Sequence, residues 1–215
     1  MINMAQSARQ YQITNEVLNS VTHGIGIILS IVAFVFLMLK AYADGQPLEW
    51  AAFIIYGCSL FVLYTCSTLF HGLYFTRARE VFRIFDHSGV YVLIAGTYTP
   101  YSLLAIKGWL GWTILLTIWI LAIAGITVNA VWPGRLKKVE TVIYVLMGWM
   151  CLAGGRQLWD HLGVTGFWLL VAGGVAFTLG ALLYSFPRIK YLHVIWHLFV
   201  MVGTTLMFFS IYFYI

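Results

Sequence analysis

Long apolar segments, each nearly free of charged residues, follow one another along the whole chain of 215 residues. Hydrophobic residues make up 62% of the sequence and charged residues only 9%, whereas about 25% of the residues in a soluble domain are charged. A soluble fold of this length could not cover its surface with so few charges. The sequence therefore predicts a protein that lies in a lipid bilayer, and it excludes a soluble enzyme and a nucleic-acid-binding protein.

Each apolar segment is long enough to cross a bilayer as an α-helix, which takes about 20 residues. Charges, Gly or Pro separate the segments, whose expected spans are Leu18–Tyr42, Trp50–Tyr74, Asp86–Ile106, Trp109–Trp132, Val139–Leu158, Val164–Ser185 and Tyr191–Ile215. Pro100 lies inside the third span and predicts a kink or a loosened helix there. We expect an all-α integral membrane protein of the cell membrane: one domain of seven transmembrane helices over residues 18–215, after a short polar N-terminal tail over residues 1–17.

The positions of the basic residues predict how the bundle is oriented. Nine of the 12 Lys and Arg residues lie in the tail or after the second, fourth and sixth segments: Arg9, Arg77, Arg79, Arg83, Arg135, Lys137, Lys138, Arg188 and Lys190. The other three, Lys40, Lys107 and Arg156, lie on the opposite side. Because basic loops stay in the cytoplasm, we expect a cytoplasmic N-terminus, and a C-terminus outside.

Ionisable residues inside a bilayer are costly and therefore indicate function. With the predicted orientation, five of the six histidines lie at the cytoplasmic ends of their segments: His23, His71, His87, His193 and His197. The orientation rests on Lys and Arg alone, so this clustering of histidines is an independent observation.

Three of these histidines have the spacing of a zinc site. His193 and His197 lie one helical turn apart on one face, and His71 can supply a third imidazole from another helix. Three imidazoles with an open position are typical of catalytic zinc, and no cysteine is suitably placed. Asp86 is the only aspartate at this level and could accept the proton of a water molecule. Ser67 precedes His71 by four residues, so its hydroxyl faces the same side as a hydrogen-bond donor.

Other interpretations of the same residues remain open. A pair of histidines four residues apart is a weak signal by itself. Asp86 could pair with Arg83 or cap its helix, and the Ser67 hydroxyl could bond to its own helix backbone. His87 points about 100° away from Asp86 around the helix, which favours an interfacial position over metal binding.

A polar stripe also marks the first segment. Glu16, Asn19 and His23 lie at positions i, i+3 and i+7, which places them on one face of a helix. We favour a structural role, in which the stripe packs this helix into the bundle, over a direct role in the site.

Together these residues resemble the motifs of a known family. The motifs are Glu16-x2-Asn19-x3-His23-Gly24, Ser67-Thr68-Leu69-Phe70-His71, Phe85-Asp86-His87-Ser88-Gly89-Val90-Tyr91 continuing to Ala95-Gly96-Thr97-Tyr98-Thr99-Pro100, and Tyr191-x-His193-x2-Trp196-His197. In this order and spacing the chain resembles the hemolysin III-type bacterial membrane proteins, relatives of the progestin and adipoQ receptors, which include the adiponectin receptors.

The resemblance implies a seven-helix bundle with a cytoplasmic N-terminus and zinc bound by His71, His193 and His197. It also implies that Asp86 holds the zinc-bound water, with Ser67 nearby. A wider kinship with alkaline ceramidases suggests hydrolysis of a lipid amide.

Two functions follow as hypotheses. The first is a zinc-dependent hydrolase that cleaves an amide or ester bond of a membrane lipid. The second is a non-enzymatic sensor or regulator of lipid or energy state, in which zinc is structural. A pore-forming hemolysin agrees less well with the sequence, because no run of amphipathic helices could line an aqueous pore.

Overall fold

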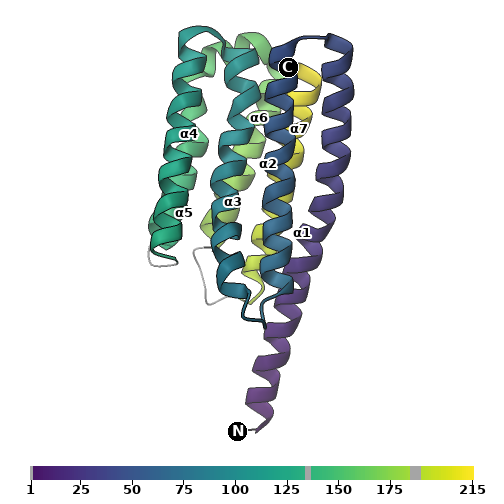
Figure 1. Ribbon diagram of the computed structural model, residues 1–215, viewed down its shortest axis with the longest axis vertical. Coiled ribbons are helices and arrows are strands. Elements are labelled where there is room, and N and C mark those ends of the chain that lie inside the picture. Colours follow the sequence, from purple (N-terminus) through teal and green to yellow (C-terminus); the bar gives the residue numbers. More distant parts are fainter. Residues whose placement is uncertain (1, 134–136, 185–189) are drawn as a thin grey trace.

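The computed structural model describes the backbone of residues 2–133, 137–184 and 190–215, and this part of the chain contains helices and turns but no strand (Figure 1). Side chains are described for the same ranges except at residues 2–5, 8, 137 and 138. Arg135 and Arg188, which enter the predicted orientation, lie outside the described residues, as do the side chains of Lys137 and Lys138. The prediction of an all-α chain is confirmed.

The helices stand side by side in one bundle (Figure 1). They are α1 (Ile2–Asp44), α2 (Pro47–Gly72), α3 (Arg79–Pro100), the π-helix η1 (Tyr101–Ile106), α4 (Gly108–Val131), α5 (Lys137–Gly148), the 3₁₀-helix η2 (Trp149–Gly154), α6 (Gly155–Tyr184) and α7 (Leu192–Tyr214). Six helical runs within the described ranges are long and apolar enough to cross a membrane: Arg9–Asp44, Pro47–Gly72, Arg79–Ile106, Gly108–Val131, Val139–Tyr184 and Leu192–Tyr214. The fifth predicted segment falls within one of these runs, Val139–Tyr184, and so does the sixth apart from its last residue, Ser185, which lies outside the described residues.

Gly163 interrupts this long run. Its backbone has φ 63° and ψ −176°, a conformation that glycine adopts at little cost because it lacks Cβ. Glu140, near the start of the run, pairs with His87 near the start of α3. Just after Gly163, Gly166 packs against Tyr214 at the end of α7, which lies at the opposite end of the bundle (Figure 1). The segments on either side of Gly163 therefore run in different directions.

Pro100 ends the α-helical geometry of α3. The following six residues, Tyr101–Ile106, form a π-helix, and all of them are buried. The Lys107 N–H donates to the Ser102 carbonyl at 3.0 Å, five residues back. Proline has no N–H to donate and its ring clashes with the preceding turn, so the helix widens after it. The prediction that Pro100 loosens the third segment is confirmed.

The first helix is longer than the sequence suggested. The residues predicted as a tail are helical from Ile2 and continue α1, which extends beyond the bundle at its N-terminal end (Figure 1). Glu16, Asn19 and His23 are buried, while apolar side chains such as Ile28 are exposed. This is the reverse of a soluble protein's helix and is expected of a helix that faces lipid.

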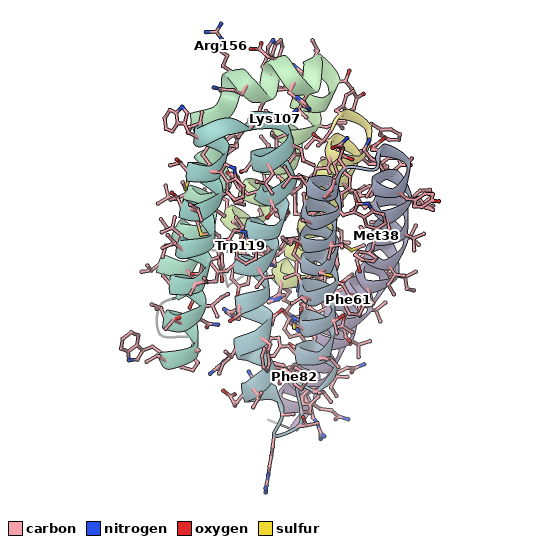
Figure 2. All side chains as sticks on the ribbon, turned by 45° about the horizontal axis from the view of Figure 1, so that its top comes forward. Met38, Phe61, Phe82, Lys107, Trp119 and Arg156 are labelled. Atoms are coloured by element: carbon pink, nitrogen blue, oxygen red, sulfur yellow. The ribbon has the colours of Figure 1, made fainter. Side chains whose placement is uncertain are left out.

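Labelled side chains mark the two ends of the bundle. Lys107 and Arg156 lie together at one end, whereas Phe82 lies at the other (Figure 2). Two of the three basic residues that the sequence places on the opposite side from the N-terminus, Lys107 and Arg156, therefore share one end of the structure.

Candidate metal centre

Two helices bring three imidazoles together inside the bundle. His71 comes from the last turn of α2, and His193 and His197 come from the first turns of α7. One nitrogen of each ring lies within 4.8 Å of the others, and the ring centroids are 4.8–5.0 Å apart. The structure thus groups the three histidines that the sequence proposes as ligands, in an arrangement that is compatible with a metal ion.

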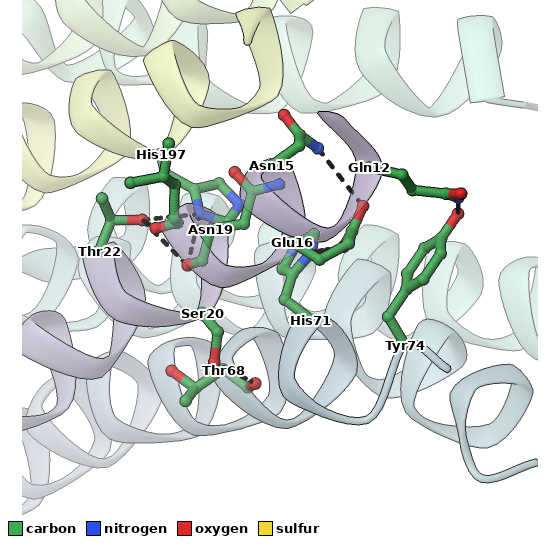
Figure 3. Close-up of polar contacts among 11 residues, drawn as sticks. Gln12, Asn15, Glu16, Asn19, Ser20, Thr22, Thr68, His71, Tyr74 and His197 are labelled. Carbon is green, nitrogen blue, oxygen red and sulfur yellow. Dashed lines mark hydrogen bonds and ion pairs between the residues drawn. The ribbon is translucent and has the colours of Figure 1, made fainter. Parts of the chain in front are cut away.

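The hydrogen bonds of two of these rings leave one nitrogen of each for a ligand. His71 Nδ1 lies 2.7 Å from Glu16 Oε2, and His197 Nδ1 lies 3.2 Å from the Asn19 carbonyl oxygen and 3.3 Å from Thr22 Oγ1 (Figure 3). A neutral imidazole that donates from Nδ1 carries a lone pair on Nε2. His71 Nε2 is buried and has no hydrogen-bond partner among the described residues, which is unfavourable for a polar atom unless a ligand binds it. The donor set therefore fits a zinc ion, for which imidazole is a suitable ligand.

Ser67 and Asp86 line a cavity beside the metal centre. The Ser67 hydroxyl is buried and has no hydrogen-bond partner in the described part of the chain, so the alternative bond to its own helix is not observed. Helix α3 already begins at Arg79, so Asp86 lies within the helix and does not cap it. Arg83 pairs with Glu80 at 2.7 Å. The predicted roles of Asp86 as the proton acceptor of a water molecule and of Ser67 as a nearby hydrogen-bond donor stay predictions.

The cavity has a polar end and an apolar end. Its volume is about 140 Å³, and it extends from Asp86 and His197 to Tyr101, Ile106 and Leu158. Ile106 is the last residue of η1, at the far end of the same membrane-spanning run as Asp86. An apolar chain could therefore lie along the bundle with its polar group at the histidines.

His87 pairs with a carboxylate from α5, and its predicted interfacial position stays a prediction. Its Nδ1 lies 3.2 Å from Glu140 Oε2, and both residues line the cavity. Tyr144 Oη donates to the His87 carbonyl at 2.9 Å. Sequence reasoning missed Glu140, a buried carboxylate. Its place directly after the start of an apolar segment was the signal that could have identified it.

The polar stripe of α1 contacts the metal centre as well as packing the helix. The ring of His23 stacks on that of His197, with centroids 3.6 Å apart and planes 8° apart. His23 also lines the cavity, and both its ring nitrogens lack a hydrogen-bond partner within the described ranges. The stripe therefore contacts the candidate metal centre in addition to the structural role that the sequence favours.

Comparison with known proteins identifies the family. A family model described as "Haemolysin-III related" matches residues 11–208. The Hemolysin-3 of Bacillus cereus is 42% identical over 203 residues, which cover 94% of this chain and 93% of that protein. The Hemolysin-3 homolog of Bacillus subtilis is 40% identical over 204 residues, covering 95% and 96% of the two chains.

A weaker similarity extends to animals. The human Monocyte to macrophage differentiation factor is 28% identical over 167 residues, which cover 75% of this chain and 69% of that protein. This match agrees with the predicted relationship to the progestin and adipoQ receptors. No solved structure matches the chain. Six apolar helical runs that are long enough to cross a membrane lie within the described ranges. The chain belongs to the haemolysin-III related family and is an integral, multi-pass membrane protein.

Proposed function

We propose that this protein is a zinc-dependent hydrolase that cleaves an amide or ester bond of a lipid within the membrane. The observation that carries the proposal is the group of His71, His193 and His197 at the polar end of a long apolar cavity. Water attack on a lipid bond requires a polar centre beside an apolar binding space, and the described residues provide both.

The proposal includes a bundle of seven transmembrane helices with a cytoplasmic N-terminus. The break at Gly163 supports seven crossings, because it divides Val139–Tyr184 into two parts that each suffice to cross. The second part ends at Tyr184, whose ring packs against that of His193 with centroids 5.2 Å apart. In the orientation favoured by the basic residues, the metal centre lies near the cytoplasmic face.

Each residue of the centre has a distinct role in this mechanism. His71, His193 and His197 would hold the zinc ion, which when bound supplies a Lewis acid that polarises the scissile carbonyl and activates water for attack. Asp86 accepts the proton of the attacking water as the new carbon–oxygen bond forms. It then returns this proton to the amine or alcohol that leaves as the old bond breaks.

Two further features hold the substrate. The Ser67 hydroxyl, which has no partner among the described residues, donates a hydrogen bond at the polar end of the cavity. The apolar end of the cavity, which Tyr101 and Leu158 line, holds the acyl chain and excludes water from it. The substrate thus lies with its reactive bond at the histidines and its chain along the bundle.

A non-enzymatic regulator is the second candidate. The histidines belong to α2 and α7, so a bound ion would also tie these two helices together. In that case metal binding contributes to folding, and removing the metal greatly lowers the unfolding temperature. A pore-forming function is less well supported, because the helices expose apolar side chains and bury their polar groups.

The test combines metal content with turnover. The wild type and the Asp86→Asn variant are purified in detergent without chelators, and zinc is measured by elemental mass spectrometry. Hydrolysis is then assayed with a panel of N-acyl lipid amides and lipid esters. Asp44→Asn, which removes a carboxylate paired with Lys40 outside the centre, is the matched control.

We expect the wild type and both variants to bind zinc, and Asp86→Asn to lose about 10²–10⁴-fold in turnover, the usual contribution of a general acid–base group. Full activity of Asp86→Asn would overturn the role of Asp86. Absence of zinc from the wild type would overturn the proposed hydrolase. A zinc-loaded protein that hydrolyses no member of the panel, and unfolds at a much lower temperature after chelation, would favour the regulator.

A further inference from the structure

We infer that Glu16 of α1 is a positioning residue of the metal centre, which holds His71 in the tautomer and orientation that present Nε2 to the ion. The inference rests on the zinc site of the proposed function. It extends that site from α2 and α7 to a third helix.

The contact between Glu16 and His71 is short and buried. Glu16 Oε2 lies 2.7 Å from His71 Nδ1, and the two side chains are 9% and 2% exposed. An ionised carboxylate only accepts hydrogen bonds, so the proton of this bond belongs to Nδ1. Its lone pair then lies on Nε2. A carboxylate behind a metal-bound histidine fixes the ring in this way and makes the imidazole a better ligand.

The other contacts of Glu16 support the same role. Asn15 Nδ2 donates to Glu16 Oε1 at 3.3 Å (Figure 3), which occupies the carboxylate oxygen that does not face His71. A carboxylate at this depth is costly in a bilayer, and a helix seam alone does not require a charge. His71 is the partner that explains why the buried residue at this position is a glutamate.

The first helix supports a second ligand one turn further on. The Asn19 carbonyl oxygen lies 3.2 Å from His197 Nδ1, so a backbone group of α1 accepts a hydrogen bond from the N–H of this ring, as the Glu16 carboxylate does from His71. Helix α1 thus holds one histidine from α2 and one from α7 in the same tautomer. Full metal affinity consequently requires that α1 is docked against both helices.

Zinc affinity is the readout that separates positioning from packing. The wild type, Glu16→Gln and Glu16→Ala are stripped of metal in detergent, and zinc is returned in competition with a chelator. Glu49→Gln is the matched control, because it removes a carboxylate from the other end of α2. Unfolding temperatures of the metal-free proteins and the absorption spectrum of bound Co²⁺ are recorded beside the affinities.

Loss of an outer carboxylate typically lowers metal affinity about 10–100-fold. We expect Glu16→Gln, whose amide oxygen can still accept from Nδ1, to lie at the lower end of this range and Glu16→Ala at the upper end. The Co²⁺ spectra of these variants should shift, and the affinity of Glu49→Gln should stay at the wild-type value. Glu16→Gln, which keeps an acceptor for His71 Nδ1, should also keep the metal-free unfolding temperature of the wild type, whereas Glu16→Ala leaves that buried donor unpaired and should unfold at a lower temperature.

Three results would overturn the inference. Wild-type zinc affinity in Glu16→Ala, or in Glu16→Gln if the alanine variant does not fold, would contradict it while leaving the proposed function intact. Loss of affinity in Glu16→Gln that only parallels a loss of metal-free stability would assign Glu16 to packing. A wild type that binds no zinc would overturn the proposed function together with this inference.

Discussion

The described residues include two histidine–carboxylate pairs that differ in which buried atom is left without a partner. In Glu16–His71 the atoms are 2.7 Å apart, and the histidine side chain is 2% exposed. In Glu140–His87 they are 3.2 Å apart, and the histidine side chain is 18% exposed. Among the described residues, the buried atom without a hydrogen-bond partner is the ring nitrogen Nε2 of His71 in the first pair and the carboxylate oxygen Oε1 of Glu140 in the second.

The surroundings of the two pairs explain this difference. His71 has two further imidazoles beside it, His193 and His197. His87 belongs to no group of three possible metal ligands in the part of the chain that the structure describes. A histidine–carboxylate pair therefore becomes a candidate metal site only where other ligands converge on the free nitrogen.

The largest expected difference between the two pairs is in bound zinc, measured after the histidine of each pair is removed. We expect His71→Ala to lose the zinc bound by the wild type, because two protein ligands remain where a site of this kind needs three. His87→Ala should retain it. Elemental mass spectrometry on protein purified without chelators measures both, and an equal loss in the two variants would show that the pairs form one centre.

The second pair should instead affect stability. His87→Ala leaves the buried Glu140 carboxylate without its partner, so we expect the free energy of unfolding to fall by about 1–3 kcal/mol. Unfolding by urea in detergent with chelator present measures this change independently of metal. The double variant His87→Ala/Glu140→Ala should lose less than the two single losses combined, and strict additivity would contradict a coupled pair.

The smallest effect is expected from the hydroxyl that supports the second pair. Tyr144→Phe removes the hydrogen bond from Tyr144 Oη to the His87 carbonyl and keeps the ring. We expect a loss of about 0.5–1.5 kcal/mol in unfolding free energy and unchanged zinc affinity. A fall in zinc affinity of this variant would mean that the two regions communicate.

Local patterns in the sequence predict much of this molecule. The apolar segments predict the helices, Pro100 predicts the irregular end of α3, and the spacing of His193 and His197 places both on one face. Each of these inferences depends on residues within a few helical turns, so it does not require knowledge of how the helices pack.

The contacts between helices could not be predicted in the same way. Glu16 is separated from His71 by 55 residues, and His87 from Glu140 by 53, so each contact depends on how two helices rotate against each other. The angle between Asp86 and His87 around α3 separates the directions of the two side chains, but it does not determine which helix faces His87. The helical start of α1 was missed for another reason: its polar residues indicated a tail, although no proline precedes Pro47 to end a helix.

The length of α1 has a mechanical consequence. The helix has 43 residues, and Tyr11 and Gln12 contact Tyr191 and Tyr74. At a rise of 1.5 Å per residue, the helical part before Tyr11 is a rigid arm of about 14 Å. A force on the free end of such an arm is transmitted as a torque to the carboxylate that faces His71. A fusion partner or affinity tag is therefore better attached at the C-terminus, because a load on the N-terminus would act on the metal centre itself.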